Sequence, residues 1–366
     1  MRELVGDYRR LEAKGEPIGR GVVTSVWGSA PRRPGASMLA TSGGAIAGSV
    51  SGGCVESATA TEIAYAIQQR RPKVVEFGVS DETAWNVGLA CGGTIRILVE
   101  PQVRPEFIDL LDGPHGLVLA TVVEEGALLG AGLLVLDDGS VRGPYAPASA
   151  GETDGDTDTA IRVLEGAVDA VRLAALDALR HQRSVVERVP LPDGSELEVF
   201  FEVHSKRPRL VIFGGVHVAS ALVALAKPLG YRTIVADGRE AFVTPDRFPD
   251  ADELICAWPE EAFAQIQLDT ATYVCILSHD PKFDEPALEI ALQSRAAYVG
   301  AIGSRKTQAA RRQRLLDTGL TEEQVGRLRG PIGLDLGGTH PSETALAILA
   351  EITAVRNGAS GGRLSR

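Results

Sequence analysis

From Arg209 onward, short apolar segments alternate with helical patterns, and this alternation restricts the possible folds more than any other feature of the sequence. The apolar segments include RLVIF, TIVAD, ELICAW, TYVCILS and AYVGAI. Strands with such continuous apolar runs are buried on both faces, and strands that are separated by helices lie parallel in one sheet. Residues 207–358 are therefore predicted to form a Rossmann-type α/β domain with a doubly wound parallel sheet.

The preceding part of the chain is predicted to be an α/β lobe with an internal duplication. Residues 34–48 (PGASMLATSGGAIAG) align without gaps with residues 129–143 (LGAGLLVLDDGSVRG), and each segment is followed by a helical pattern and two further strand patterns. Self-similarity at a fixed offset is the signature of repeated structural units. The predicted boundaries are 1–112 for the first copy, 113–206 for a degenerate second copy with a linker, and 359–366 for a disordered tail.

The two copies differ in their glycine- and cysteine-containing loops, which only the first copy has. Cys54 follows Gly52 and Gly53 at the start of a helical pattern, and Cys91 is followed by Gly92. The N–H groups and dipole of a helix start favour a thiolate, and glycines let a ligand approach the backbone. The alternative is a pair of small buried cysteines beside tight turns. We take Cys54 and Cys91 as the candidate catalytic and metal-ligating residues.

Two arginines lie in a loop that prolines restrain on both sides. Arg32 and Arg33 are flanked by Pro31 and Pro34. A guanidinium group offers a planar fork of donors that matches phosphate, so this loop is a candidate phosphate-binding element. A solvated basic loop is an equally good interpretation of the same residues.

The predicted Rossmann domain carries only half of a dinucleotide-binding fingerprint. Gly214, Gly215 and His217 follow the first strand, but Val216 stands where the G-x-G-x-x-A pattern requires a glycine. Further polar residues follow the second, fourth and fifth strands, at the edge where open α/β sheets bind ligands. These residues are Asp237, Arg239, His279, Asp280, Ser304 and Arg305. Asp237 stands about 20 residues beyond the glycines, where a ribose-binding acid belongs; Ser304 could instead cap the next helix.

Charge and composition exclude several classes of protein. A net charge of −11 argues against a binder of nucleic acid or of anionic membranes. No stretch approaches the ~18 apolar residues of a membrane span, and the N-terminus lacks the apolar run of a signal peptide. We therefore expect a cytoplasmic protein, in which the four cysteines do not form a disulfide framework. Their scattered spacing does not match an iron–sulfur motif.

Several long motifs together resemble the xanthine dehydrogenase accessory protein family, XdhC/CoxI. The segment GSAPRRPGASMLATSGGAIAGSVSGGCVE resembles the N-terminal signature of that family, and GLACGGTIRILVEP resembles its second cysteine motif. The C-terminal motifs RLVIFGGVHVA, YVGAIGSRKT and GPIGLDLGGTHPSETALAIL are similar to the family's Rossmann domain. The resemblance covers most of the chain and is weakest between about residues 105 and 195.

The resemblance implies a chaperone of the molybdenum cofactor rather than a turnover enzyme. Such a protein binds the molybdopterin cofactor and assists its sulfuration or its insertion into an apo molybdenum hydroxylase of the xanthine or CO dehydrogenase type. Cys54 and Cys91 are then the candidates for contact with the metal or its sulfur. A cysteine desulfurase is an implied partner, and a homo-oligomer is compatible with the sequence. The alternative function is an NAD(P)-dependent oxidoreductase that uses the Rossmann domain.

Overall fold

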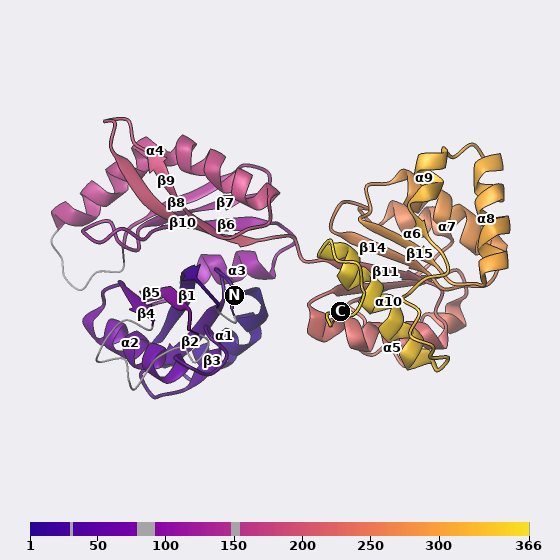
Figure 1. Ribbon diagram of the computed structural model, residues 1–366, viewed down its shortest axis with the longest axis horizontal. Helices are drawn as coiled ribbons and strands as arrows, with labels where there is room; N and C mark the ends of the chain where they lie inside the picture. Colours follow the sequence, from indigo (N-terminus) through magenta and orange to yellow (C-terminus); the bar gives the residue numbers. More distant parts are fainter. Residues whose placement is uncertain (30–31, 79–91, 148–153, 366) are drawn as a thin grey trace. The chain divides into compact units, whose positions relative to one another are not determined.

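The computed structural model describes residues 1–29, 32–78, 92–147 and 154–365, and the chain divides into two compact units, Met1–Lys206 and Arg207–Arg366 (Figure 1). The first unit contains two antiparallel sheets, and the second contains one parallel sheet. The mixed α/β fold class, with a Rossmann-type sheet after an α/β lobe, is confirmed. Among the described residues, no helix has the length and apolar character needed to span a membrane.

The two sheets of the first unit have the same strand order. Their orders are β3-β2-β1-β5-β4 and β8-β7-β6-β10-β9, so each strand of the first sheet has a counterpart five strands later. One long helix lies between the third and fourth strands of each copy. The elements of the first copy are η1 (Arg2–Leu4), α1 (Val5–Glu12), β1 (Ile18–Trp27), β2 (Ser37–Thr41), β3 (Ile46–Gly48), α2 (Glu56–Gln69), β4 (Lys73–Phe77) and β5 (Thr94–Glu100). After α3 (Pro105–Asp112), the elements of the second are β6 (Leu117–Val122), β7 (Gly132–Leu136), β8 (Val141–Tyr145), α4 (Asp154–Arg180), β9 (Val185–Pro190) and β10 (Glu196–His204).

The aligned segments 34–48 and 129–143 form equivalent hairpins. Leu39 pairs with Ala47 in the first hairpin, and Leu134 pairs with Arg142 in the second, which is the same register at the same offset. A shared strand order combined with a shared register supports the predicted duplication of this lobe.

Successive side chains of a strand point to opposite faces of the sheet, and the two faces of each sheet in the first unit pack against different partners. One face packs against the copy's own helix, as Val23 and Ile97 do with α2. The helix α2 approaches β1 closely because glycine stands at Gly19 and Gly21, where a Cβ atom would meet α2 side chains at 2.5 and 2.9 Å. The other face packs against the opposite copy, where Phe200 lies in one apolar cluster with residues of β1 and β5. The unit is thus a pair of helix-covered sheets packed face to face.

A buried arginine joins the two copies inside this interface. The Arg20 side chain is 1% exposed, and its Nε donates to Glu100 at 2.8 Å while its Nη1 donates to Glu202 at 2.8 Å. Burial lowers the pKa of Arg20, but the two carboxylates outweigh it and raise that pKa above its ordinary value. Burial raises the pKa of Glu202, but Arg20 and His204 outweigh it and hold the pKa at about 2. Arg20 and Glu202 therefore both stay charged near neutral pH.

The second unit has the strand order of a Rossmann fold. All its strands are parallel, in the order β13-β12-β11-β14-β15-β16. Helices α5 and α10 cover one face, and α6 to α9 pack around the other. The strands are β11 (Arg209–Phe213), β12 (Arg232–Asp237), β13 (Glu253–Cys256), β14 (Thr272–Ile276), β15 (Tyr298–Ala301) and β16 (Leu328–Arg329). The helices are α5 (His217–Ala226), η3 (Lys227–Leu229), η4 (Glu240–Phe242), α6 (Pro259–Ala264), α7 (Pro281–Gln293), α8 (Arg305–Asp317), α9 (Glu322–Gly326) and α10 (Pro341–Arg356).

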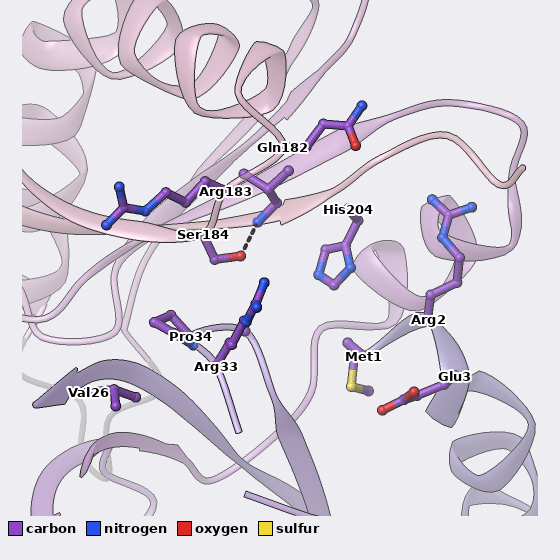
Figure 2. A pocket seen from close by; sticks show the side chains of 12 residues that line it. Met1, Arg2, Glu3, Val26, Arg33, Pro34, Gln182, Arg183, Ser184 and His204 are labelled. Atoms are coloured by element: carbon purple, nitrogen blue, oxygen red, sulfur yellow. Dashed lines mark hydrogen bonds between the residues drawn. The ribbon is translucent and has the colours of Figure 1, made fainter. Parts of the chain in front are cut away.

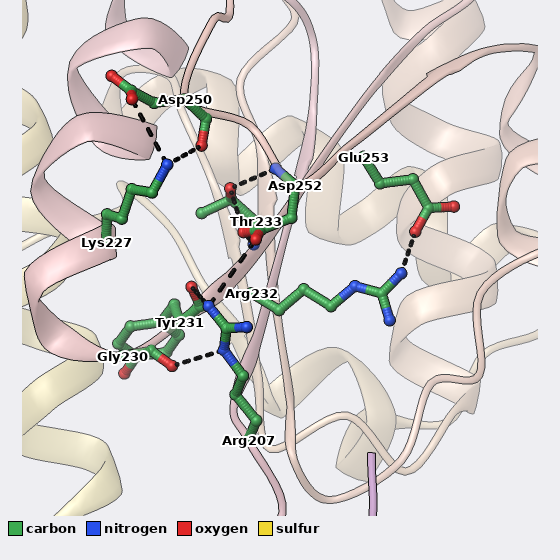
Figure 3. Close-up of polar contacts among 9 residues, drawn as sticks. All are labelled: Arg207, Lys227, Gly230, Tyr231, Arg232, Thr233, Asp250, Asp252 and Glu253. Carbon is green, nitrogen blue, oxygen red and sulfur yellow. Dashed lines mark hydrogen bonds and ion pairs between the residues drawn. The ribbon is translucent and has the colours of Figure 1, made fainter. Parts of the chain in front are cut away.

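The amino-terminal edge of this sheet is held by polar contacts that involve the start of the unit (Figure 3). The Asp252 carboxylate accepts hydrogen bonds from the backbone N–H of Thr233 at 2.9 Å and from its hydroxyl at 3.1 Å. Arg207 lies 3.8 Å from the same carboxylate and donates to the carbonyl of Gly230 at 3.3 Å. These contacts fix strands, and they lie at the edge opposite to the one where such sheets bind ligands.

We expect the Arg20→Met substitution to destabilise the protein by about 3–5 kcal/mol, because it leaves two buried carboxylates without their cation. Arg96→Met is the matched control. Arg96 also joins the copies, through Glu198 at 3.1 Å, but this pair is partly exposed and should contribute about 1 kcal/mol or less. Chemical denaturation of both variants measures the difference. Equal losses would contradict a central role for Arg20.

Candidate functional site

The glycine- and cysteine-containing loops lie at one end of the first sheet. Trp27 at the end of β1 pairs with Thr94 at the start of β5, and Val22 pairs with Ser37 at the start of β2. The loop that follows β3 begins at the same end, because Gly48 pairs with Met38. Antiparallel pairing therefore gathers residues 28–29, 32–36, 49–55 and 92–93 in one region.

The carboxylate of Glu56 organises the Cys54 loop. It accepts hydrogen bonds from the backbone N–H groups of Gly52 at 2.9 Å and Gly53 at 2.8 Å, and from the hydroxyls of Ser49 at 2.6 Å and Ser51 at 2.7 Å. Burial raises the pKa of Glu56, but these hydrogen bonds lower it well below its ordinary value. The turn needs glycine, because Gly52 and Gly53 have φ values of +89° and +125°. The loop is thus held around a negative charge of its own.

Cys54 stands exposed on this loop as a free cysteine. The N–H groups that we expected to be free for a thiolate or ligand are not. Those of Gly52 and Gly53 bind Glu56, and those of Cys54 and Val55 donate to the Ser51 hydroxyl at 3.0 and 3.1 Å. What the loop offers a ligand is therefore the sulfur atom itself, carried on a backbone that these hydrogen bonds hold in place.

The second cysteine motif is only partly described. Cys91 lies outside the described residues, so its proximity to Cys54 and a shared metal site remain predictions. The following residue Gly92 and its neighbour Gly93 are described, and a Cβ atom at Gly93 would lie 2.2 Å from the carbonyl oxygen of Ser29. Glycine is needed here because the chain passes directly against the end of β1. Among the residues that the structure describes, no group of three or more His, Cys, Asp or Glu is placed to hold a metal ion.

The two arginines of the proline-flanked loop have different surroundings. Arg32 pairs with Glu3 at 3.3 Å. Arg33 is exposed and lines an open pocket of about 700 Å³ in the first unit. Figure 2 shows this pocket, with residues of both copies in its wall. The lining residues are Met1, Arg2, Glu3, Val26, Arg33, Pro34, Gly35, Gln182, Arg183, Ser184, Val203 and His204.

The dinucleotide-binding elements of the second unit are occupied by the protein itself. Asp237 is buried and accepts hydrogen bonds from the Gly215 N–H at 2.8 Å and from the Arg239 guanidinium at 2.9 and 2.8 Å. Burial raises the pKa of Asp237, but these donors lower it below its ordinary value. Both carboxylate oxygens are therefore engaged where a ribose hydroxyl would need an acceptor.

The turn after β11 is closed by neighbouring backbone. A Cβ atom at Gly215 would lie 2.1 Å from the carbonyl oxygen of Phe242, and one at Gly214 would lie 2.6 Å from the Ser278 nitrogen. The Arg239 guanidinium lies 3.7 Å from the centre of the Phe242 ring. Val216 is half-buried and packs against the core beside α5. Phe242 therefore obstructs the approach of a phosphate group to this turn, in addition to Val216, which stands in place of a glycine.

The remaining predicted residues at this edge are exposed or cap helices. Asp280 accepts from the Lys282 N–H at the start of α7, and Ser304 accepts from the Thr307 N–H at the start of α8. Capping accounts for these two side chains in the described structure. His217, His279 and Arg305 are exposed.

Sequence reasoning missed two carboxylates that fill glycine-rich loops. Glu56 fills the first, and Glu343 accepts from the N–H groups of Thr339 and His340 before α10. In both places a glutamate follows the glycines within a few residues, as in a capping box, and this spacing could have revealed them. It also missed a buried network in which Arg311 donates to Asp284 at 2.7 Å.

We expect Glu56→Gln to destabilise the first unit by about 1–3 kcal/mol, because an amide cannot accept all the loop hydrogen bonds that the carboxylate accepts. Glu62→Gln on the same helix is the control, since Glu62 makes only a partly exposed pair with Lys73. Equilibrium unfolding in denaturant compares them. If Glu62→Gln costs as much as Glu56→Gln, the loop does not depend on Glu56.

Comparisons with known proteins connect this architecture to one family. The model of the XdhC and CoxI family matches residues 11–78, and the XdhC Rossmann domain matches residues 210–352, which together cover more than half of the chain. The fold resembles the crystal structure of a xanthine dehydrogenase from Bacillus halodurans, with a TM-score of 0.72, 24% identity and coverage of 99% of this chain and 97% of that one.

Two relatives match over nearly their full length. A Bacillus subtilis (strain 168) protein, whose name describes it as a probable subunit of xanthine dehydrogenase, is 26% identical over 340 residues, which are 91% of this chain and 92% of that protein. The molybdenum cofactor insertion chaperone PaoD of Escherichia coli (strain K12) is 26% identical over 365 residues, 96% of this chain and 90% of that protein. The chain therefore belongs to the XdhC/CoxI family of xanthine dehydrogenase accessory proteins.

Proposed function

We propose that this protein binds the molybdenum cofactor as cargo and assists its sulfuration or its insertion into a molybdenum hydroxylase of the xanthine or CO dehydrogenase type. The observation that carries the proposal is the position of Cys54, an exposed free cysteine on a loop that Glu56 holds in place. The relative named as a molybdenum cofactor insertion chaperone supports the same role.

The chemistry of this loop suits the capture of a metal-bound cofactor. Thiolates are soft ligands, and a molybdenum centre held by a dithiolene accepts soft donors. Because hydrogen bonds already hold the backbone of this loop, little backbone entropy is lost when a ligand binds to Cys54, which favours retention. Trp27, about half exposed at the same end of the sheet, offers an aromatic face for a planar ring. The proposed role is to hold and transfer, without a requirement for turnover.

The partners follow from this role. The recipient is an apo molybdenum hydroxylase, and a cysteine desulfurase would supply the sulfur. We place this protein in the cytoplasm, so its partners would have to act there as well. Cys91 is the proposed second contact with the cargo metal or its sulfur.

The alternative, an NAD(P)-dependent oxidoreductase, receives less support from the described residues. Asp237 is bound by Gly215 and Arg239, and Phe242 lies against the glycine turn. A nucleotide would have to displace these internal contacts before it could bind, and that displacement lowers affinity.

We expect Cys54→Ala to fold normally while it retains several-fold less molybdenum and fails to activate a partner hydroxylase, because it removes only an exposed sulfur. Cys256→Ala is the matched control, since Cys256 is also exposed and free. Cys275→Ala is the structural control, because Cys275 is fully buried and its loss should lower the thermal midpoint.

The assay purifies each variant with a molybdenum enzyme operon and measures molybdenum, pterin and thermal midpoint together. Wild-type cofactor content and client activation in Cys54→Ala would refute the assignment of this loop.

We also expect calorimetry with NAD and NADP to show no binding tighter than about 1 mM, near −4 kcal/mol. The physical reason is that the ribose acceptor and the phosphate turn are already occupied. Micromolar binding to the wild-type protein would restore the oxidoreductase as the better hypothesis.

A further inference from the structure

The open pocket of the first unit contains two arginines that no carboxylate neutralises. Within the described residues, the guanidinium groups of Arg33 and Arg183 form no hydrogen bond or ion pair, although both line the pocket. Arg33 comes from the proline-flanked loop of the first copy, and Arg183 follows α4 in the second. In Figure 2 the Arg33 side chain points from the first copy toward Ser184 and His204 of the second, whereas the Arg183 side chain extends away from Arg33.

The other ionisable side chains of the pocket leave it basic. Among the described residues of its lining, Glu3 is the only acidic one, and it pairs with Arg32 at 3.3 Å. Arg2 donates to the carbonyl of His115 at 3.2 Å. Burial lowers the pKa of His204, although Glu202 opposes this effect, so His204 is neutral near pH 7. A local excess of positive charge in a chain with a net charge of −11 attracts small anions to this place.

The duplication supplies an internal comparison for this pocket. Gly35 lies against Ser184, and the equivalent Gly130 lies against Pro72, with contacts of 2.9 and 2.8 Å for an added Cβ atom. The two copies thus meet in two related places. In the second place the Arg104 side chain donates to the Gly130 carbonyl at 2.7 Å, and the remaining cavity is only about 10 Å³.

Of these two related places, the one near Gly35 is therefore open and the one near Gly130 is closed. In the closed place an arginine is bound by the protein itself, whereas in the open place two arginines have no internal partner among the described residues. Unpaired guanidinium groups in the lining of an open pocket are well suited to bind phosphate, because each offers a planar fork of charged donors.

We propose that this pocket binds the phosphoryl group of a small molecule, with Arg33 from one copy and Arg183 from the other as its ligands. The volume of about 700 Å³ is ample for a phosphorylated heterocycle. The inference rests on the proposed function in one respect: the phosphorylated molecule would be the pterin cargo. The second copy, which has no cysteine motif, would then contribute to cargo binding through Arg183.

The test measures inorganic pyrophosphate binding to the full chain by calorimetry at low and moderate salt. Arg33→Gln and Arg183→Gln should each weaken binding about tenfold or more, because each loses a charge-assisted contact. Arg180→Gln is the matched control, since Arg180 lies three residues from Arg183, is exposed and already pairs with Asp177. It should bind pyrophosphate as the wild type does.

Two variants separate this inference from the proposed function. Cys54→Ala should keep pyrophosphate binding and lose molybdenum, whereas Arg183→Gln should lose pyrophosphate binding and retain less pterin. Wild-type pyrophosphate affinity in Arg183→Gln, equal losses in Arg180→Gln, or no binding to the wild type would overturn the pocket assignment without affecting the Cys54 result. Unchanged molybdenum in Cys54→Ala would refute the proposed function and leave pyrophosphate binding as it is.

Discussion

The first unit depends on the charge of Arg20, which is buried between two sheets that would otherwise bring carboxylates together. Glu100 and Glu202 occupy equivalent positions in the two copies. Glu100 lies opposite Arg20 on the central strand of the first sheet, and Glu202 lies opposite Leu119 at the corresponding position of the second. Two buried carboxylates of like charge would repel, and one arginine binds both. The duplication therefore cannot be symmetric at its centre, because a single cation is needed and only one copy supplies it.

This asymmetry extends outward to the surface of the unit. The place near Gly130 is filled by Arg104, while the related place near Gly35 stays open and basic. The cysteine-containing loop is likewise present in only one copy. In a duplicated lobe of this kind, equivalent positions of the two copies can differ in role: those near Gly130 make structural contacts, and those near Gly35 are open to a ligand.

Internal carboxylates occupy the loops that would ordinarily bind anions. Glu56, Glu343 and Asp237 each accept backbone N–H groups of a glycine-containing turn. Such groups attract phosphate when they are free, so their occupation shifts ligand chemistry to exposed side chains. In this protein those side chains are the sulfur of Cys54 and the guanidinium groups around the open pocket.

The sequence by itself determined the α/β class and the parallel sheet of the Rossmann-type domain, and it predicted the duplication, because apolar runs and a fixed offset can be read directly from the chain. It also predicted Cys54 and Arg33 as candidate site residues, since glycines precede the first and prolines flank the loop of the second. Only the tertiary structure decided which of these groups are available to a ligand. The amides of the Cys54 loop and the carboxylate of Asp237 are taken by partners that local patterns do not reveal. Arg33 and Arg183 line one pocket only because the two copies pack face to face. Packing decides which polar groups already have hydrogen-bond partners and which distant residues line the same pocket, and for that reason no local pattern of the sequence encodes either property.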